Sequence, residues 1–256
     1  MNQEKYAVVF GGGGSRGAYE VGVLKAIKEL DIPVGTFIGA SIGALNATFA
    51  VQGTDLEKLY LKISLNDVIP NEKLNPNKDI FSIENIFTAF IGFLKNKGYS
   101  TNNLRDLINR FINLDSIYSS SVDLGIVTCT TPFAPIVAFK NEIPKEQLVD
   151  YIIASAGFPI FKRQVINGKK CIDGGFWDNV PVNVAIKKGY HKIISVDLSS
   201  VGSRKPTIKA DDLDIISIKA PRNSLGGLFE LNPDLIKSNI SAGYIATIDA
   251  FLRTNK

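Results

Sequence analysis

Two short glycine-framed motifs could place a serine hydroxyl on a sharp turn, where it can act as a nucleophile. Residues Gly39–Gly43 (GASIG) and Gly13–Gly17 (GGSRG) both match the pattern G-x-S-x-G. Glycines two residues either side of the serine let the chain turn tightly from strand to helix and lift the serine oxygen above the sheet. The surroundings of the two motifs have to decide between them.

Ser41 has the surroundings that a nucleophile on such a turn requires. An apolar segment precedes it, and small residues crowd around it. Ser15 instead lies within a run of glycines, whose backbone N–H groups at the start of a helix suit the stabilisation of negative charge. The sequence therefore predicts Ser41 as the nucleophile and the first glycine turn as an oxyanion hole.

A serine nucleophile also needs a base, and the chain contains one histidine, His191. It lies between lysines just before an apolar run, which is typical of the polar entry to a buried strand. We therefore interpret His191 as structural and expect a carboxylate base.

Asp173 is the carboxylate with the most suitable setting. It follows an apolar strand and precedes Gly174 and Gly175, which bend the chain and leave the side chain accessible. Asp178 and Asp197 are weaker candidates. Taken alone, Asp173 would be interpreted as a turn-forming aspartate, and only its combination with the serine motifs favours a catalytic role.

Hydrophobic periodicity predicts the elements that must position these residues. Strand and helix patterns alternate, which indicates one α/β domain over residues 1–256, with a largely parallel sheet between two helical layers. Thr54 with Glu57 predicts a capping box, and Asn167-Gly168 a hairpin turn. Strands are expected at 6–10, 34–38, 124–129, 136–139, 163–172, 192–198 and 214–218, and helices near 16–30, 42–51 and after 54, 181 and 232.

Residues 66–121 differ from this alternation. They contain few strand signals and a dense apolar stretch at Ile80–Leu94. We expect a helical insertion, in which the apolar stretch is either a helix packed on the core or a lid that contacts membrane.

The first glycine turn also admits a different function. Gly12-x-Gly14-x-x-Gly17 follows a predicted strand and opens a helix, as in a dinucleotide-binding fingerprint. That fingerprint requires an acidic residue at the end of the second strand, where this chain runs into Ser41. A dinucleotide-binding oxidoreductase is kept as an alternative. No lysine followed by serine or threonine ends either turn, so no Walker phosphate loop is predicted.

Composition and charge limit the classes of binding partner that the chain could have. The net charge of +4, with a pI near 8.9, comes from scattered lysines, which argues against a nucleic-acid surface but is compatible with weak attraction to anionic membranes. Cys129 and Cys171 lie in apolar runs and are expected to be buried thiols, and neither a metal site nor a cofactor is implied. The N-terminal residues show no signal peptide or spanning helix, so a cytoplasmic location is expected, with peripheral membrane contact left open.

Four blocks of the sequence resemble the patatin-like phospholipases. The blocks occur in that family's order between about residues 5 and 200. They resemble its oxyanion segment, its nucleophile elbow, the block before its aspartate and the aspartate block itself: Gly11–Leu24, Gly39–Ala47, Ala154–Phe161 and Asp173–Pro181.

This resemblance implies a three-layer α/β/α fold and hydrolysis of lipid or phospholipid esters by a Ser41–Asp173 dyad. It further implies that the oxyanion is bound by backbone N–H groups of Gly12, Gly13 and Gly14, in a loop supported by Arg16 and Gly17. Glu20 departs from the family, many bacterial members of which carry histidine there, and residues 66–121 match no motif. A catalytically silent lipid-binding module with the same fold is the second alternative, and the oligomeric state is left open.

Overall fold

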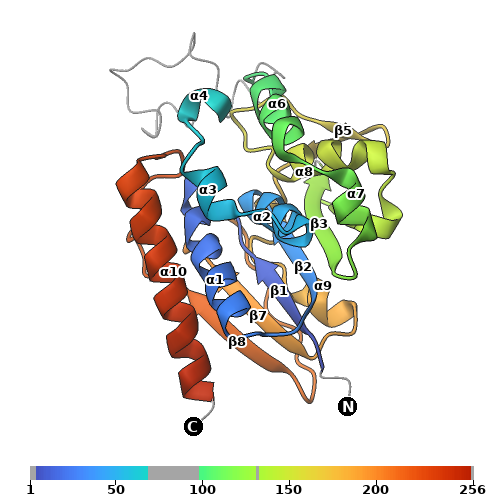
Figure 1. Cartoon of the computed structure of the whole chain (residues 1–256). Coiled ribbons are helices and arrows are strands. Elements are labelled where there is room, and N and C mark those ends of the chain that lie inside the picture. Colours follow the sequence, from blue (N-terminus) through green and yellow to red (C-terminus); the bar gives the residue numbers. More distant parts are fainter. Residues whose placement is uncertain (1–3, 69–97, 131–132, 255–256) are drawn as a thin grey trace.

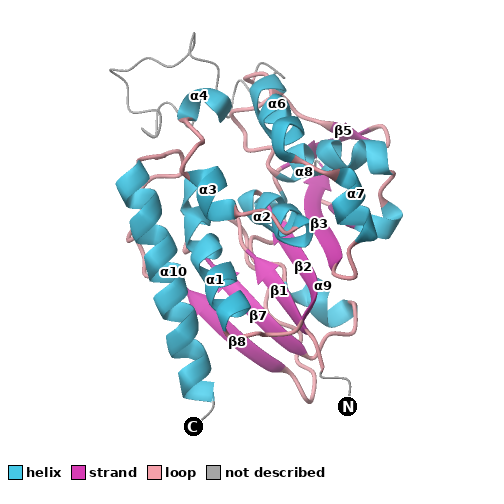
Figure 2. Cartoon of the chain, viewed as in Figure 1, coloured by secondary structure: helices cyan, strands magenta, loops and turns pink. Residues whose placement is uncertain are grey.

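A computed structural model describes residues 4–68, 98–130 and 133–254 of the chain. Its centre is an eight-stranded sheet in the order β5-β6-β3-β2-β1-β7-β8, with β4 paired to β3 (Figures 1 and 2). Neighbours from β3 to β8 along this order run parallel, whereas β4, β5 and β6 pair antiparallel, so the predicted largely parallel sheet is confirmed. The strands are β1 (Tyr6–Phe10), β2 (Val34–Ala40), β3 (Asp123–Thr130), β4 (Pro135–Phe139), β5 (Val165–Ile166), β6 (Lys169–Ile172), β7 (Lys192–Asp197) and β8 (Asp214–Lys219).

The two faces of the sheet are covered unequally. Val8 and Phe10 of β1 face a large core shared with most of the helices, while the alternate residues Ala7 and Val9 face a smaller cluster beneath α9 (Val182–Lys187). Figure 1 shows α1 and α10 side by side in front of the strands. The helices on the thicker side are α1 (Ala18–Glu29), α2 (Ile42–Gln52), α3 (Leu56–Tyr60), α6 (Asn102–Phe111), α7 (Leu114–Ser119), α8 (Leu148–Ser155) and α10 (Pro233–Thr254).

Short helical turns complete the chain. The 3₁₀ turns η1 (Gly14–Gly17) and η5 (Gly174–Phe176) follow β1 and Asp173, and α4 (Leu65–Val68) lies where the predicted insertion begins. Helices α6 and α7 lie within residues 98–121, and the helical insertion at 66–121 stays a prediction. The apolar stretch Ile80–Leu94 lies outside the described residues.

Most predicted local features are present, with one correction. Asn167 and Gly168 both have positive φ, 49° and 75°, as the predicted hairpin turn requires. The capping box at Thr54 is wrong, because Asp55 caps α3 by accepting a hydrogen bond from the Lys58 N–H at 3.2 Å. The Thr54 hydroxyl instead accepts from the Gln52 amide at 2.8 Å.

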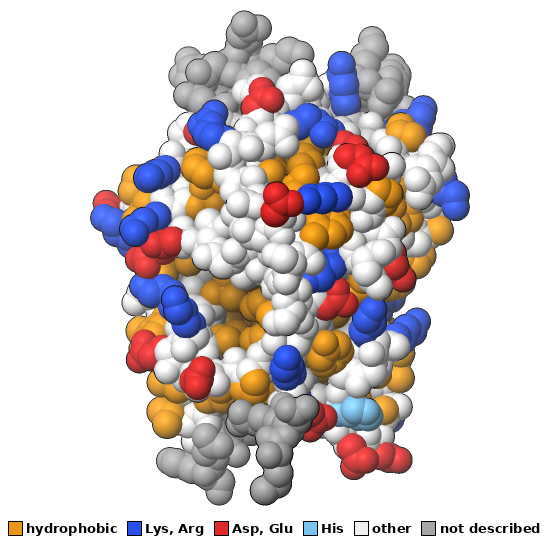
Figure 3. Space-filling model, turned by 45° about the vertical axis from the view of Figure 1, so that its right-hand side comes forward, with side chains coloured by type: hydrophobic (Ala, Val, Ile, Leu, Met, Phe, Trp, Pro, Cys, Tyr) orange, Lys and Arg blue, Asp and Glu red, His pale blue; other side chains and the backbone are white. Residues whose placement is uncertain are grey.

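The surface of the protein carries charges of both signs. On the face shown in Figure 3, basic and acidic side chains are interspersed, with hydrophobic side chains between them. Among the described residues, no helix combines the length and the apolar character needed to cross a bilayer.

Helices α1 and α10 approach closely through two glycines. A Cβ at Gly22 would collide with the Ile240 carbonyl oxygen, and one at Gly243 would collide with that of Tyr19. The two backbones therefore contact one another directly at this crossing.

Gly22→Ala should destabilise the protein by about 1–3 kcal/mol through overpacking, although alanine at an exposed helical position is favoured over glycine by about 1 kcal/mol. Chemical denaturation measures the change. Ser241→Ala, at an exposed position of α10, should stay within about 0.5 kcal/mol of the parent. An unchanged or raised stability in Gly22→Ala would show that the crossing is not tightly packed.

Candidate active site

Two strands that end facing each other create the site. Strand β4 pairs with β3 from Gly125 to Cys129, so β2 and β6, which also pair with β3, must share its other edge. Strand β2 ends at Ala40, opposite Val127, and the antiparallel β6 ends at Ile172, opposite Cys129. The residues that follow these ends, Ser41 and Asp173, are therefore brought to the same short gap beside β3.

A short hydrogen bond joins the two side chains across this gap. The Ser41 hydroxyl donates to Oδ2 of Asp173 at 2.6 Å. Ser41 is partly exposed, while Asp173 keeps only 4% of its surface accessible. The hydroxyl is thus reachable from outside, and its carboxylate partner is shielded from water.

The backbone at Ser41 is strained in the way its motif predicts. Ser41 has φ 57° and ψ −128°, a conformation that few residues other than glycine adopt. A Cβ at Gly39 would collide with the backbone of Gly43, and one at Gly43 would lie 2.6 Å from the Phe10 carbonyl oxygen. Both glycines are needed because the turn brings backbone against backbone.

A buried serine that the sequence interpretation left without a role holds this turn. The Ser155 hydroxyl accepts a hydrogen bond from the Ser41 N–H at 3.0 Å and donates one to the Val127 carbonyl at 2.6 Å. Ser155 is fully buried at the end of α8. Its place inside the block Ala154–Phe161 was the available signal, but only the fold reveals its partners.

Burial controls the protonation of Asp173. Loss of hydration raises its pKa to about 6, although hydrogen bonds from the Ser41 hydroxyl and the Gly175 N–H, the latter at 2.8 Å, partly offset the shift. A Cβ at Gly174 would collide with the Val127 carbonyl oxygen, so this glycine allows the chain after Asp173 to approach β3.

Asn179 ties the glycine loop to the chain that follows Asp173. The Gly12 N–H donates to the Asn179 carbonyl at 3.0 Å, and the Asn179 amide donates to the Gly12 carbonyl at 3.1 Å. The Gly12 N–H is therefore already engaged. Within the described part of the chain, the N–H groups of Gly13 and Gly14 have no such partner.

The other side of the glycine loop is held by the segment before α10. Ser15 donates its N–H to the Leu228 carbonyl and its hydroxyl to the Gly227 carbonyl, each at 2.8 Å. The Arg16 guanidinium donates to the Gly226 carbonyl at 2.8 Å. Both hydrogen-bonding groups of Ser15 thus have structural partners, as does the Arg16 side chain.

A buried polar cluster connects the glycine loop to the helix that begins after Ser41. Asn46 of α2 donates to the Gly17 carbonyl at 3.0 Å and to the Glu20 carboxyl at 2.7 Å, and accepts from the Tyr60 hydroxyl at 3.0 Å. Glu20 is completely buried, and this burial raises its pKa well above the usual range. Glu20, the position that departs from the family, therefore has a packing role beneath the loop.

The remaining candidates have other settings. His191 precedes β7 at the opposite end of the sheet, roughly 20 Å from the site at about 3.3 Å per strand residue. The Asp178 carboxyl accepts from the Lys205 N–H at 3.3 Å. No group of three or more potential metal ligands occurs among the described residues. Both cysteines are buried and free, as expected.

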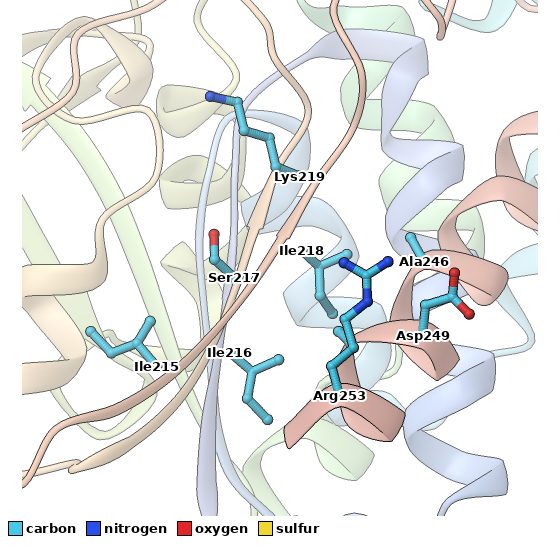
Figure 4. Close-up of a pocket in the computed structure, with 9 residues that line it drawn as sticks. Ile215, Ile216, Ser217, Ile218, Lys219, Ala246, Asp249 and Arg253 are labelled. Atoms are coloured by element: carbon cyan, nitrogen blue, oxygen red, sulfur yellow. The ribbon is translucent and has the colours of Figure 1, made fainter. Parts of the chain in front are cut away.

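A cavity of about 460 Å³ lies away from these residues, along the edge strand β8. Figure 4 shows Asp249 and Arg253 of α10 beside Ile216 and Ile218 of β8. Neither Ser41 nor Asp173 lines it, and nothing in its lining resembles a reaction centre.

Ser155→Ala should lower the free energy of unfolding by about 2–6 kcal/mol, because two backbone groups each lose a partner at about 1–3 kcal/mol apiece. Urea denaturation provides the measurement. Thr48→Val is the matched control, since the buried Thr48 hydroxyl donates only to the Ala44 carbonyl of its own helix and should cost less than about 1 kcal/mol. Equal losses in both variants would mean that the Ser155 bridge has no special contribution.

Comparisons with known proteins agree with this architecture. The family model described as patatin-like phospholipase matches residues 8–186. Two proteins named lysophospholipase NTE1 align with the chain: that of Scheffersomyces stipitis is 25% identical, covering 100% of this chain and 16% of its own length, and that of Candida albicans is 27% identical, covering 83% and 14%. The chain thus spans about a sixth of the length of these curated relatives.

The crystal structure of VipD from Legionella pneumophila shares the fold, with a TM-score of 0.58 at 13% identity, covering 97% of this chain and 67% of that one. The chain belongs to the patatin-like phospholipase family.

Proposed function

We propose that this chain is a serine acyl-ester hydrolase that acts on lipids, with Ser41 as nucleophile and Asp173 as base. The observation that carries the proposal is the 2.6 Å hydrogen bond from the Ser41 hydroxyl, on its strained turn, to the buried carboxyl of Asp173. A nucleophile within hydrogen-bonding reach of its base is the arrangement that covalent catalysis needs.

The reaction uses groups of this chain in two half-reactions. Asp173 takes the hydroxyl proton as Ser41 attacks the ester carbonyl carbon, and the oxyanion that forms is bound by the N–H groups of Gly13 and Gly14. Asp173 then gives the proton to the departing alcohol as the ester bond breaks. Asp173 then takes a proton from water as the water attacks the acyl-enzyme, and it returns this proton to the Ser41 oxygen as the carboxylic acid is released.

Membership of the family and the names of the relatives support a lipid acyl ester as substrate. We extend this to phospholipids and lysophospholipids as the substrate class. A cytoplasmic location with peripheral membrane contact stays a prediction from the sequence.

The dinucleotide-binding alternative gains no support from the site. Strand β2 leads into Ser41 and not into a carboxylate that could hold a ribose. The Leu228 carbonyl oxygen lies against Gly14 and accepts from the Ser15 N–H, which occupies backbone that a pyrophosphate would need. The silent lipid-binding module differs from the hydrolase only in reactivity, which labelling can measure.

A fluorophosphonate should label the protein covalently at Ser41. Ser41→Ala should abolish the labelling and lower turnover of a short-chain nitrophenyl ester by on the order of 10³-fold or more. Ser15→Ala should keep a substantial part of both, because the Ser15 hydroxyl donates to the Gly227 carbonyl and not to Asp173.

Circular dichroism confirms beforehand that each variant is folded. A folded parent protein that neither reacts nor turns over would identify a silent module. Loss of labelling in Ser15→Ala, with Ser41→Ala unaffected, would reverse the assigned roles.

The pH dependence should follow Asp173. Only its ionised form accepts the Ser41 proton, so kcat/KM should fall as the pH is lowered through the raised pKa of about 6. Burial also raises the pKa of Asp178 to about 6, so this second carboxylate needs a control. Because Asp173 is the proposed base, Asp178→Asn and His191→Gln should both retain the acidic limb. Its disappearance in His191→Gln would replace the proposed base.

A further inference from the structure

A second cavity lies on the thinly covered side of the sheet, between β4 and α9. Its volume is about 530 Å³, within the roughly 300–1,000 Å³ typical of small-molecule sites. Neither Ser41 nor Asp173 lines it, so it is separate from the proposed active site and does not depend on the proposed function.

The unequal layers of the fold explain why this cavity is open and apolar. Helix α9 has six residues and packs over β1 and β7, whereas β4, among the described strands, pairs with β3 alone. Alternate residues of a strand share one face, and Pro135, Val137 and Phe139 all line the cavity. Trp177, from the loop after Asp173, lines it as well.

The charged residues that line the cavity all carry one sign. They are Lys187, Lys188 and Lys205, and no described carboxylate lines the cavity with them. Lys188 is engaged, because its Nζ lies 3.7 Å from an Asp123 carboxylate oxygen and 3.7 Å from the centroid of the Phe139 ring. Lys187 and Lys205 are exposed, and in the described part of the chain neither forms an ion pair, although the Asp178 carboxyl is near enough to Lys205 to interact with it electrostatically.

We propose that this cavity binds a single-chain anionic lipid, of which a long-chain fatty acid is the simplest form. The alkyl chain lies against Val137, Phe139 and Trp177, and the anionic head meets the ammonium groups of Lys187 and Lys205. An apolar cavity with a few convergent polar groups is the usual form of such a site. The cavity along β8 lacks this match, because Asp249 lines it together with Lys219 and Arg253.

Trp177 makes binding directly measurable, because it is the one tryptophan of the chain. Titration with dodecanoate below its micelle concentration should give a saturable blue shift of the Trp177 emission. Octanoate should bind far more weakly, since each methylene contributes about fourfold to affinity. Dodecyl phosphate distinguishes the two sources of such an anion. If it binds more tightly than dodecanoate, the natural ligand carries a phosphate, as a lysophospholipid does. If it binds more weakly, the natural ligand is a fatty acid, and both ligands belong to the proposed class.

Head-group recognition is tested by charge. Dodecyltrimethylammonium, with the same chain and the opposite charge, should bind at least about tenfold more weakly, and Lys187→Ala and Lys205→Ala should each raise the Kd for dodecanoate severalfold. Lys237→Ala is the matched control, an exposed lysine on α10, against the opposite face of the sheet. All variants should keep the parent's thermal unfolding temperature.

Val137→Glu places a carboxylate within the cavity and should abolish the response. Equal affinity for the cationic amphiphile, unchanged affinity in both lysine variants, or an unchanged response in Val137→Glu would each overturn the proposal. Loss of the response after fluorophosphonate modification of Ser41 would also overturn it, because it would place the lipid in the active site.

Discussion

The site depends on a geometric constraint: two strands occupy one edge of β3 from opposite directions. Strand β2 runs parallel to β3 and ends at Ala40, while β6 runs antiparallel and ends at Ile172. Hydrogen-bonded pairing fixes the register of both strands, so it also fixes the position of the first residue after each strand end. The contact between Ser41 and Asp173, 132 residues apart, is thus set by backbone pairing before any side chain is considered.

Buried polar side chains then hold the loops around this gap. Ser155 connects the Ser41 turn to β3, Asn179 connects Gly12 to the segment after Asp173, and Asn46 connects Gly17 to α2. Each bridge satisfies backbone groups whose burial would otherwise cost about 1–3 kcal/mol. The same bridges fix loop positions, so the polar groups that stabilise the fold here also set the geometry available for chemistry.

The two faces of the sheet have different consequences. The thick side, where α1 and α10 cross through Gly22 and Gly243, buries most of the apolar surface. The opposite side has the short helix α9 over the central strands and leaves the outer strand β4 partly open. A sheet that is fully stabilised from one side can keep an apolar cavity on the other, next to the loop that carries Asp173.

Local sequence patterns predict the alternation of strands and helices, the two glycine turns and the candidates Ser41 and Asp173, because periodicity and turn chemistry are local properties. They also identify Ser15 as the weaker serine candidate. Only the folded chain shows that the Gly12 N–H donates to Asn179 and that Ser155 supports the Ser41 turn. It also shows that His191 lies at the far end of the sheet. These outcomes depend on which backbone groups find partners across long sequence separations, and no local pattern specifies such partners.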